Sequence, residues 1–452
     1  MAMPPSFRLV SGKALPVSDS AVYVGDARLQ LARDLQVAPA RLQLLGPTPL
    51  EDSLPLAVLP VDVQVWILPD LAENRLAKLA GVEKFDDLQE IVDLQLQLSS
   101  KSLKTLPERF GLVCRDSLQS LRILGSGFRC LPESFCKMTA LKQLVILQCN
   151  MPALPPSFVE LPSLEELTIA GSGLESLPQE IGQMVTLRLL HLTDNSLKNL
   201  PESLGMLGHL RKLEADRNQL LQLPASLLDC PDLAVLSLSK NMLKNFLTPA
   251  RPANLQVLHL EGNRMSNLQL VTMPYLQEVY IDANPLRPSL PNSCGELGSL
   301  RRLEATGCLL ETLPSSFPSL RSLEKLDISR NKLRMLPDDW GQLRSLKRLA
   351  ISGNRLQHLP ESFGDLISLQ TCHLNANELT KLPESFGRLQ ALEELCLAEN
   401  CLTVLPSSFA QLIELRCAVL TRNRLASLHE DVWKLPNLQT LVLDGNPLDA
   451  SE

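Results

Sequence analysis

Leucines recur along the chain at a fixed interval, and this interval indicates how the chain folds. The interval is 23 residues in two runs, Leu118, Leu141, Leu164, Leu187, Leu210 and Leu233, and later Leu323, Leu346, Leu369, Leu392, Leu415 and Leu438. Between the runs, Leu255, Leu276 and Leu300 follow spacings of 22, 21 and 24 residues. Phased self-similarity over such a length predicts stacked structural repeats rather than one compact core.

One complete unit, residues 346–368, reads LKRLAISGNRLQHLPESFGDLIS. Its segment L-x-x-L-x-L alternates as a short strand with one buried face must. An Asn follows where the chain bends, and its amide can pair with backbone groups that the bend leaves free. Leu-Pro then opens a short helical turn on the outer side, where Pro loses no needed donor, and a Phe fills the layer beneath the turn.

The residues expected to have these two structural roles recur in most units. The predicted Asn ladder is Asn195, Asn218, Asn241, Asn263, Asn284, Asn331, Asn354, Asn377, Asn400, Asn423 and Asn446, with Ser126, Cys149, Ser172 and Cys308 as smaller substitutes. The predicted aromatic plugs are Phe135, Phe158, Phe317, Phe363, Phe386 and Phe409.

The unit resembles the leucine-rich repeat across residues 93–448. The resemblance implies an α/β solenoid for residues 93–452, a horseshoe of about 15–16 repeats with a parallel sheet on its concave side. The irregular units from Leu233 to Ser299 predict a local change of curvature or a bulged convex loop. The Leu-Pro-x-Ser-Phe form is similar to the intracellular subgroup found in Ras-pathway scaffolds, plant Ras-group proteins and adenylate cyclases, which implies signalling or complex assembly.

Residues 6–69 do not fit the repeat. Strands at 7–10 and 14–17 flank Ser-Gly-Lys as in a hairpin, a helix is expected over 25–36, and strands follow at 41–45 and 61–68. This order describes a β-grasp domain, and Arg41-Leu42 followed by residues 50–54 (LEDSL) resembles ubiquitin. The chain continues through Pro69 without a Gly-Gly end, and Gln43 stands where ubiquitin has an exposed isoleucine. A docking module and a cap on the solenoid are both open.

Residues 70–92 are expected to form a helical linker that caps the first repeat. An apolar stripe is formed by Leu71, Leu76, Leu79, Phe85, Leu88 and Ile91. Charged residues between them, Glu73 among them, are expected to face water.

The outward positions of the concave strands are expected to have no role in the core, so their identities are the best functional signal. The candidate partner-binding residues are His191, Asp194, Glu214, Asp216, Arg217, Lys240, His259, Glu261, Tyr280, Asp282 and Arg330. Arg301, Arg302, Glu304, Asp327, Lys347 and Arg348 continue the strip. Tyr and Arg are favoured interface residues, which favours a protein-binding strip; a generally solvated sheet face is the alternative.

Charge and motif content exclude several functions. The net charge of −7 argues against binding nucleic acid, which needs a basic surface. No apolar run is long enough for a membrane helix. No secretory signal is expected, and 11 scattered cysteines favour a reducing compartment, the cytoplasm or alternatively the nucleus. Common catalytic motifs are absent, so no enzyme activity and no cofactor are expected. His373, Cys396 and Cys417 should lie on successive strands, but small apolar cysteines explain them better than a metal.

These observations predict a non-catalytic scaffold or adaptor that binds a partner protein on the concave face. The first alternative is an adaptor that delivers a bound partner to the ubiquitin-linked degradation machinery, and the second is a structural subunit of a larger assembly. The last strand, residues 438–443, has no following repeat to cover it. Self-association through this edge is therefore a further expectation.

Overall fold

The computed structural model describes residues 71–98, 103–246, 254–270 and 273–448, together with the backbone of four N-terminal strands. The chain divides into two compact units, Met1–Leu88 and Gln89–Glu452. In the first unit, strands β1 (Ser6–Leu9), β2 (Ala14–Leu15), β3 (Leu42–Leu45) and β4 (Asp62–Ile67) form one sheet in the order β2-β1-β4-β3. β1 and β4 are parallel, and both outer pairs are antiparallel. The helix expected over 25–36 lies outside the described residues.

Two helical segments follow, α2 (Leu71–Ala80) and η3 (Phe85–Glu90), where a helical linker was expected. Two details of that expectation are wrong. Leu79 is exposed, whereas Glu73 is buried. Glu73 lies three and four residues before the buried Leu76 and Ala77, so helical spacing places it on their face. The capping role stays a prediction.

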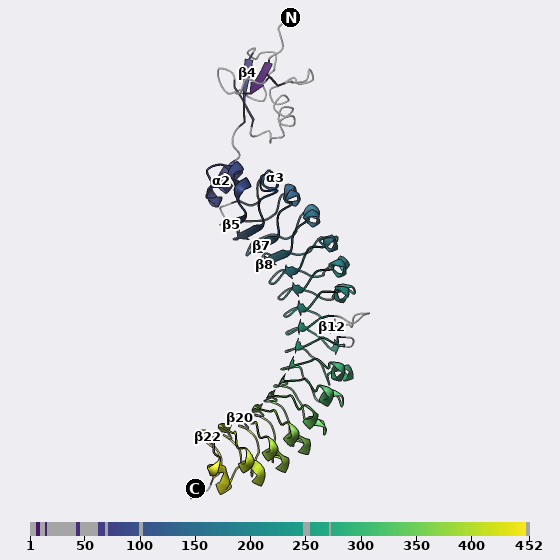
Figure 1. The fold of residues 1–452 in the computed structure, drawn as a ribbon, viewed down its shortest axis with the longest axis vertical. Helices are drawn as coiled ribbons and strands as arrows, with labels where there is room; N and C mark the ends of the chain where they lie inside the picture. The colour runs from purple at the N-terminus through teal and green to yellow at the C-terminus, as the bar shows by residue number, and fades with distance from the viewer. Residues whose placement is uncertain are drawn as a thin grey trace. The chain divides into compact units, whose positions relative to one another are not determined.

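The second unit is a curved solenoid whose concave side is one parallel sheet of 16 strands (Figure 1). Its strands are β5 (Asp93–Gln97), β6 (Ser120–Leu124), β7 (Gln143–Leu147), β8 (Glu166–Ala170), β9 (Leu189–His191), β10 (Lys212–Glu214), β11 (Val235–Ser237), β13 (Val257–His259), β15 (Glu278–Tyr280), β16 (Arg302–Glu304), β17 (Lys325–Asp327), β18 (Arg348–Ala350), β19 (Thr371–His373), β20 (Glu394–Cys396), β21 (Cys417–Val419) and β22 (Thr440–Val442). Each strand pairs in register with the strand of the next repeat, as in Leu326↔Leu349.

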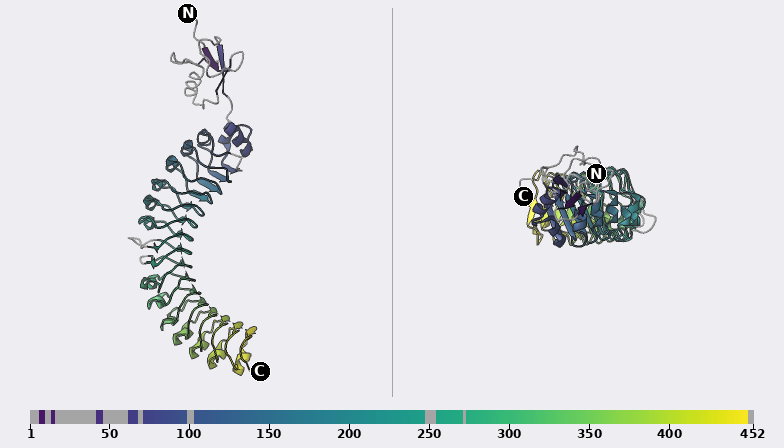
Figure 2. Two further views of the ribbon diagram at one scale, coloured as in Figure 1. Left: turned by 180° about the vertical axis from the view of Figure 1, so that it is seen from behind. Right: turned by 90° about the horizontal axis from the view of Figure 1, so that it is seen from above.

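Short helical turns line the convex side of this unit, as the views from in front and from behind agree (Figures 1 and 2). They are α3 (Phe110–Val113), η4 (Glu133–Lys137), η5 (Pro156–Glu160), η6 (Ile181–Gln183), η7 (Glu202–Met206), η8 (Leu227–Asp229), η9 (Asn292–Glu296), η10 (Phe317–Ser319), η11 (Trp340–Gln342), η12 (Glu361–Asp365), η13 (Glu384–Arg388), η14 (Ser407–Gln411) and η15 (Glu430–Lys434). In the irregular region a parallel strand pair, β12 (Asn245–Phe246) and β14 (Asn267–Leu268), lies on the convex side instead. Where a bulged convex loop was expected, a strand pair thus replaces the helical turns in part. Residues 247–253 lie outside the described residues.

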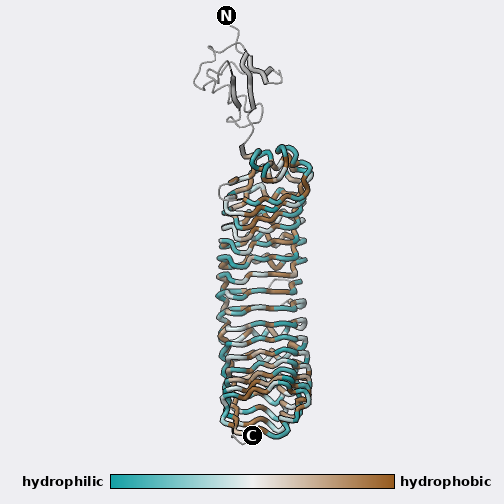
Figure 3. Tube along the Cα trace, turned by 90° about the vertical axis from the view of Figure 1, so that its left-hand side faces the viewer, coloured by the Kyte–Doolittle hydropathy of each residue, from teal (hydrophilic) through white to brown (hydrophobic). Residues whose placement is uncertain are grey.

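The core lies between these two layers and repeats from coil to coil. The leucines of the L-x-x-L-x-L segments are buried as far as the repeat of β21, and apolar and polar stretches alternate along the coils when the concave side is viewed (Figure 3). All six predicted Phe plugs are completely buried, and two neighbouring pairs stack, Phe135 on Phe158 with ring centroids 6.5 Å apart and Phe363 on Phe386 with centroids 5.8 Å apart. Trp340 takes the same place in its repeat and stacks on Phe317 at 5.7 Å.

The Asn ladder is present. Asn354 donates to the carbonyl oxygens of Ile328 and Ile351 and accepts from the backbone N–H of Leu333, so one side chain joins two adjacent repeats. Ten of the eleven predicted Asn residues are buried; Asn446, in the last described repeat, is only half-buried because no described repeat covers it. Cys308 donates through Sγ to Ile281 O at 3.1 Å. Ser126, also predicted in this ladder, is exposed, because Gly125 there adopts a φ of 121° that redirects the chain.

A second ladder on the convex side was not predicted. The Ser of Leu-Pro-x-Ser-Phe donates to a carbonyl of the preceding repeat, as Ser385 Oγ does to Glu361 O at 2.5 Å and Ser408 Oγ to Glu384 O at 2.5 Å. A Gly of the preceding repeat lies directly against this Ser: a Cβ on Gly364 would stand 2.1 Å from Ser385 O. The helical turns can approach so closely only because the glycine lacks a side chain.

Strand β22 pairs only with β21 among the described strands, and Leu441 is half-buried whereas its counterpart in β21, Ala418, is completely buried. Self-association through this edge stays a prediction.

Candidate functional site on the concave face

The eleven predicted binding residues lie at three positions of the repeat. His191, Glu214, His259 and Tyr280 are the last residues of their strands. Asp216, Glu261 and Asp282 follow two residues later. Asp194, Arg217, Lys240 and Arg330 lie in the turn before each Asn, in left-handed conformation with φ between 53° and 59°. The last group therefore borders the sheet instead of standing on a strand.

The middle group has a structural role, contrary to the expectation that outward residues have none. Asp216 Oδ1 accepts from the backbone N–H of Ser239 at 2.6 Å and from Ser237 Oγ at 2.7 Å. Asp282 Oδ1 accepts from the backbone N–H of Thr306 at 2.5 Å. These carboxylates join adjacent repeats, because the chain leaves backbone donors unpaired just after each short strand.

Three planar side chains stack across adjacent strands β13, β15 and β16. The ring centroids of His259 and Tyr280 lie 4.3 Å apart with an interplanar angle of 7°. On the other side, the guanidinium carbon of Arg302 lies 5.0 Å from the centre of the Tyr280 ring, a cation–π contact. We call His259, Tyr280 and Arg302 the stacked triad; His259 and Tyr280 were predicted candidates, and Arg302 lay in the continuation of the strip.

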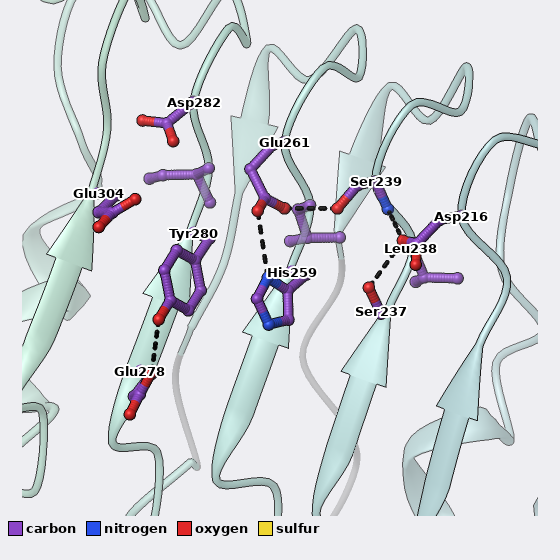
Figure 4. Close-up of polar contacts among 12 residues, drawn as sticks. Asp216, Ser237, Leu238, Ser239, His259, Glu261, Glu278, Tyr280, Asp282 and Glu304 are labelled. Atoms are coloured by element: carbon purple, nitrogen blue, oxygen red, sulfur yellow. Dashed lines mark hydrogen bonds and ion pairs between the residues drawn. The ribbon is translucent and has the colours of Figure 1, made fainter. Parts of the chain in front are cut away.

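Each member of the stacked triad is held by a carboxylate two residues away on its own coil. Glu261 Oε1 lies 3.1 Å from His259 Nδ1, and the Tyr280 hydroxyl donates to Glu278 at 2.5 Å (Figure 4). Arg302 Nε donates to Glu304 at 2.9 Å. Glu261 also accepts from Ser239 Oγ at 2.5 Å. Glu278 was not predicted, because nothing in the sequence distinguishes an acidic residue that stands two positions before a Tyr.

The carboxylates give the site a negative electrostatic potential. A hydrogen bond to Glu261, with nearby carboxylate charge, raises the pKa of His259 against the opposing effect of burial. Burial would raise the pKa of Glu261, but hydrogen bonds from His259 and Ser239 lower it overall. Burial, and then the charges of Glu304 and Glu261, raise the pKa of Asp282. Burial and the Glu278 hydrogen bond raise the pKa of Tyr280. The field thus favours cations.

Two other predicted candidates pair beside this region. His191 Nδ1 lies 3.3 Å from Glu214 Oε2, and Lys212 Nζ lies 2.8 Å from Glu214 Oε1. The structure does not bring Arg330 into the group, because it lies on the turn after β17.

A shallow hollow of about 560 Å³ opens on the concave face beside the stacked triad. It is lined by residues of five consecutive strands: Arg302, Leu303, Glu304, Lys325, Leu326, Asp327, Arg348, Leu349, Ala350, Thr371, His373 and Glu394. Lys325 and Thr371 were not singled out from the sequence, since each is one exposed residue in a unit. The sequence signal that could have identified Lys325 is a row of basic residues at equivalent positions of successive repeats, Arg302, Lys325 and Arg348.

His373 and Cys396 are register neighbours, and Cys417 pairs with Glu394 on the next strand. Among the described residues there is no group of three or more His, Cys, Asp or Glu side chains that could hold a metal ion.

Comparison with known proteins identifies the repeat. Residues 162–220 and 321–379 match the leucine-rich repeat family. A leucine-rich-repeat protein of Leptospira interrogans is 27% identical, with a TM-score of 0.66 over 85% of this chain and 95% of that one. The internalin InlF of Listeria monocytogenes is 21% identical, with a TM-score of 0.53 over 64% and 83% of the two chains. No curated protein sequence matches significantly.

The Arabidopsis receptor kinase HAESA, solved with the peptide hormone IDA and the co-receptor SERK1, has a TM-score of 0.52 and 23% identity over 83% of this chain and 72% of that one. The chain therefore carries leucine-rich repeats in a solenoid fold, and such repeats generally serve as protein-interaction modules. No described helix is both long and apolar enough to span a membrane.

Proposed function

We propose that this protein is a non-catalytic scaffold or adaptor that binds a partner protein on the concave face, with the stacked triad at the centre of the contact. The observation that carries the proposal is the fixed arrangement of His259, Tyr280 and Arg302, each held by its own carboxylate. Tyr and Arg contribute most often to binding hot spots. Side chains already held in place lose little further entropy on binding.

The test compares two tyrosines that lie five residues apart in the sequence. Tyr280 belongs to the triad, whereas Tyr275 is 55% exposed five residues earlier, before strand β15 begins. Tyr280→Ala should lower the recovery of specific partners at least tenfold in affinity purification with mass spectrometry. Tyr275→Ala should recover the same proteins as the wild type. Identical partner sets for the wild type and Tyr280→Ala, with both proteins folded, would overturn the proposal.

The setting that we propose is intracellular signalling or complex assembly, in the cytoplasm or nucleus. The supporting feature is the Leu-Pro-x-Ser-Phe form of the repeat, seen for example at residues 359–363. Fractionation of cells expressing the untagged chain tests the location, and recovery in a membrane-enclosed or secreted fraction would contradict it.

A ubiquitin-linked adaptor is the second candidate, and the strand order of the first unit favours it. A central parallel pair, β1 and β4, with antiparallel neighbours on both sides suits a β-grasp domain of the ubiquitin type. If this candidate is right, deletion of residues 1–69 should remove ubiquitin-handling proteins from the purified set and leave the Tyr280-dependent partners. A set unchanged by the deletion would contradict it.

A further inference from the structure

The charge of the concave face changes sign along the solenoid axis. Around β13 and β15 the face carries Glu261, Glu278 and Asp282, and the hydrogen bond to Glu261 together with the charge of Glu278 raises the pKa of His259 against the effect of burial. Two and three strands beyond β15, the positions equivalent to Glu278 carry Lys325 and Arg348. Arg302 lies between the two regions and is held by Glu304.

The basic side of the hollow is available to a ligand. Lys325 and Arg348 are exposed, and neither has an ion-pair partner within the part of the chain that the structure describes. Glu324, the residue before Lys325, pairs with Lys347 at 2.8 Å, and Asp327, two residues after Lys325, accepts from the backbone N–H of Ser329 at 2.9 Å. Thr371 and His373 add a hydroxyl and an imidazole to the lining. These groups suit a carboxylate, which pairs well with a guanidinium and an ammonium.

We propose that the concave face binds an extended segment of a partner protein that runs along the solenoid axis. A basic residue of the segment contacts Glu278 and Asp282 beside the stacked triad, and an acidic residue enters the hollow between Lys325 and Arg348. This inference rests on the proposed function, because it supplies the chemistry of the partner for the same face.

The geometry fixes the spacing of the two charges. Two to three strand intervals separate β15 from β17 and β18, and each interval is about 4.8 Å. An extended chain rises about 3.3 Å per residue. The basic and the acidic residue of the segment should therefore stand about three to four residues apart.

The experiment selects binders from a library of random twelve-residue peptides displayed on phage. Four full-length proteins serve as bait: the wild type, Tyr280→Ala, the double variant Lys325→Glu/Arg348→Glu, and the control Arg321→Glu/Arg344→Glu. The control makes the same charge change at exposed residues four positions earlier in the sequence and outside the hollow. Circular dichroism and melting establish that all four are folded.

The wild type and the control should enrich peptides with a basic and an acidic residue at the stated spacing. The Lys325→Glu/Arg348→Glu variant should lose the acidic preference and bind a selected synthetic peptide at least tenfold more weakly. Peptides that depend on Tyr280 but lack the acidic residue would overturn this inference and leave the proposed function standing. If no enriched peptide depends on Tyr280, the proposed function fails as well.

Discussion

The carbonyl oxygen of Ser385 lies 2.1 Å from the position that a Cβ on Gly364 would occupy. Because the obstacle is backbone of the next repeat, Gly364→Ala must push two repeats apart, and overpacking of this kind costs about 1–3 kcal/mol. Gly298 has no atom within 4 Å of its Cβ position, so Gly298→Ala should be neutral or stabilise by about 0.4–1 kcal/mol. Thermal melting compares the two variants, and equal shifts would contradict the close approach.

Asn354→Ala should destabilise the protein more than Arg355→Ala. The Asn354 amide pairs with the backbone of its own coil and of the preceding coil, and its loss leaves buried groups unpaired at about 1–3 kcal/mol. Arg355 is exposed. Urea denaturation measures both, and superimposable curves would remove the ladder argument.

The His259–Glu261 pair should stabilise the fold most in mildly acidic solution. The pKa of His259 is raised above its ordinary 6.5, so its contribution is complete below 6.5 and is lost as pH rises through the folded pKa. The pKa of Glu261 is lowered from 4.5, so its contribution is complete above 4.5 and is lost as pH falls through the folded pKa.

His259→Gln should therefore cost more unfolding free energy at about pH 5.5 than at about pH 8.5. Denaturation at both pH values, with His358→Gln on an exposed residue as the control, measures the difference. A cost for His259→Gln that does not vary with pH would mean that the imidazole is not held by Glu261.

Trp340→Phe should change stability by less than about 1 kcal/mol, because two effects oppose each other. The smaller ring loses packing against Phe317, but the buried indole N–H, which has no acceptor among the described residues, disappears. Trp340→Ala should cost about 3–5 kcal/mol. Denaturant midpoints of both variants measure the two changes in stability. Similar losses for the two would show that the unpaired indole N–H does not destabilise the wild type.

The solenoid could be predicted from sequence because a single repeat buries its leucines only by stacking. The same logic identified Asn354 and Phe363, whose positions at the bend and beneath the outer turn repeat with every unit. Contacts that arise only from the close approach of two coils were missed. Ser385 and Gly364 recur as visibly as the leucines, but their contact becomes evident only in three dimensions.

The binding strip was likewise predicted only in part. Tyr280 and His259 were chosen by residue type, whereas the support from Glu278 depends on side-chain direction. Asp216 was expected to be free for a partner and instead bonds to Ser239, because a sequence pattern does not show which backbone donors a turn leaves unpaired. Ser126 occupies the ladder position in sequence, yet the backbone at Gly125 takes it to the surface.

Cys308 interrupts the series of amide side chains between Asn284 and Asn331. The thiol donates one bond, and Leu286 N–H turns to the carbonyl of Cys308 in place of an Asn side chain. The convex strand pair β12–β14 precedes this point. Because a repeat array unfolds according to the strength of each nearest-neighbour interface, the coupling between repeats is weakened here. Under mechanical force the array should therefore unfold as two cooperative blocks, and the stacked triad lies next to the boundary between them. A partner bound across this boundary would hold the two blocks together.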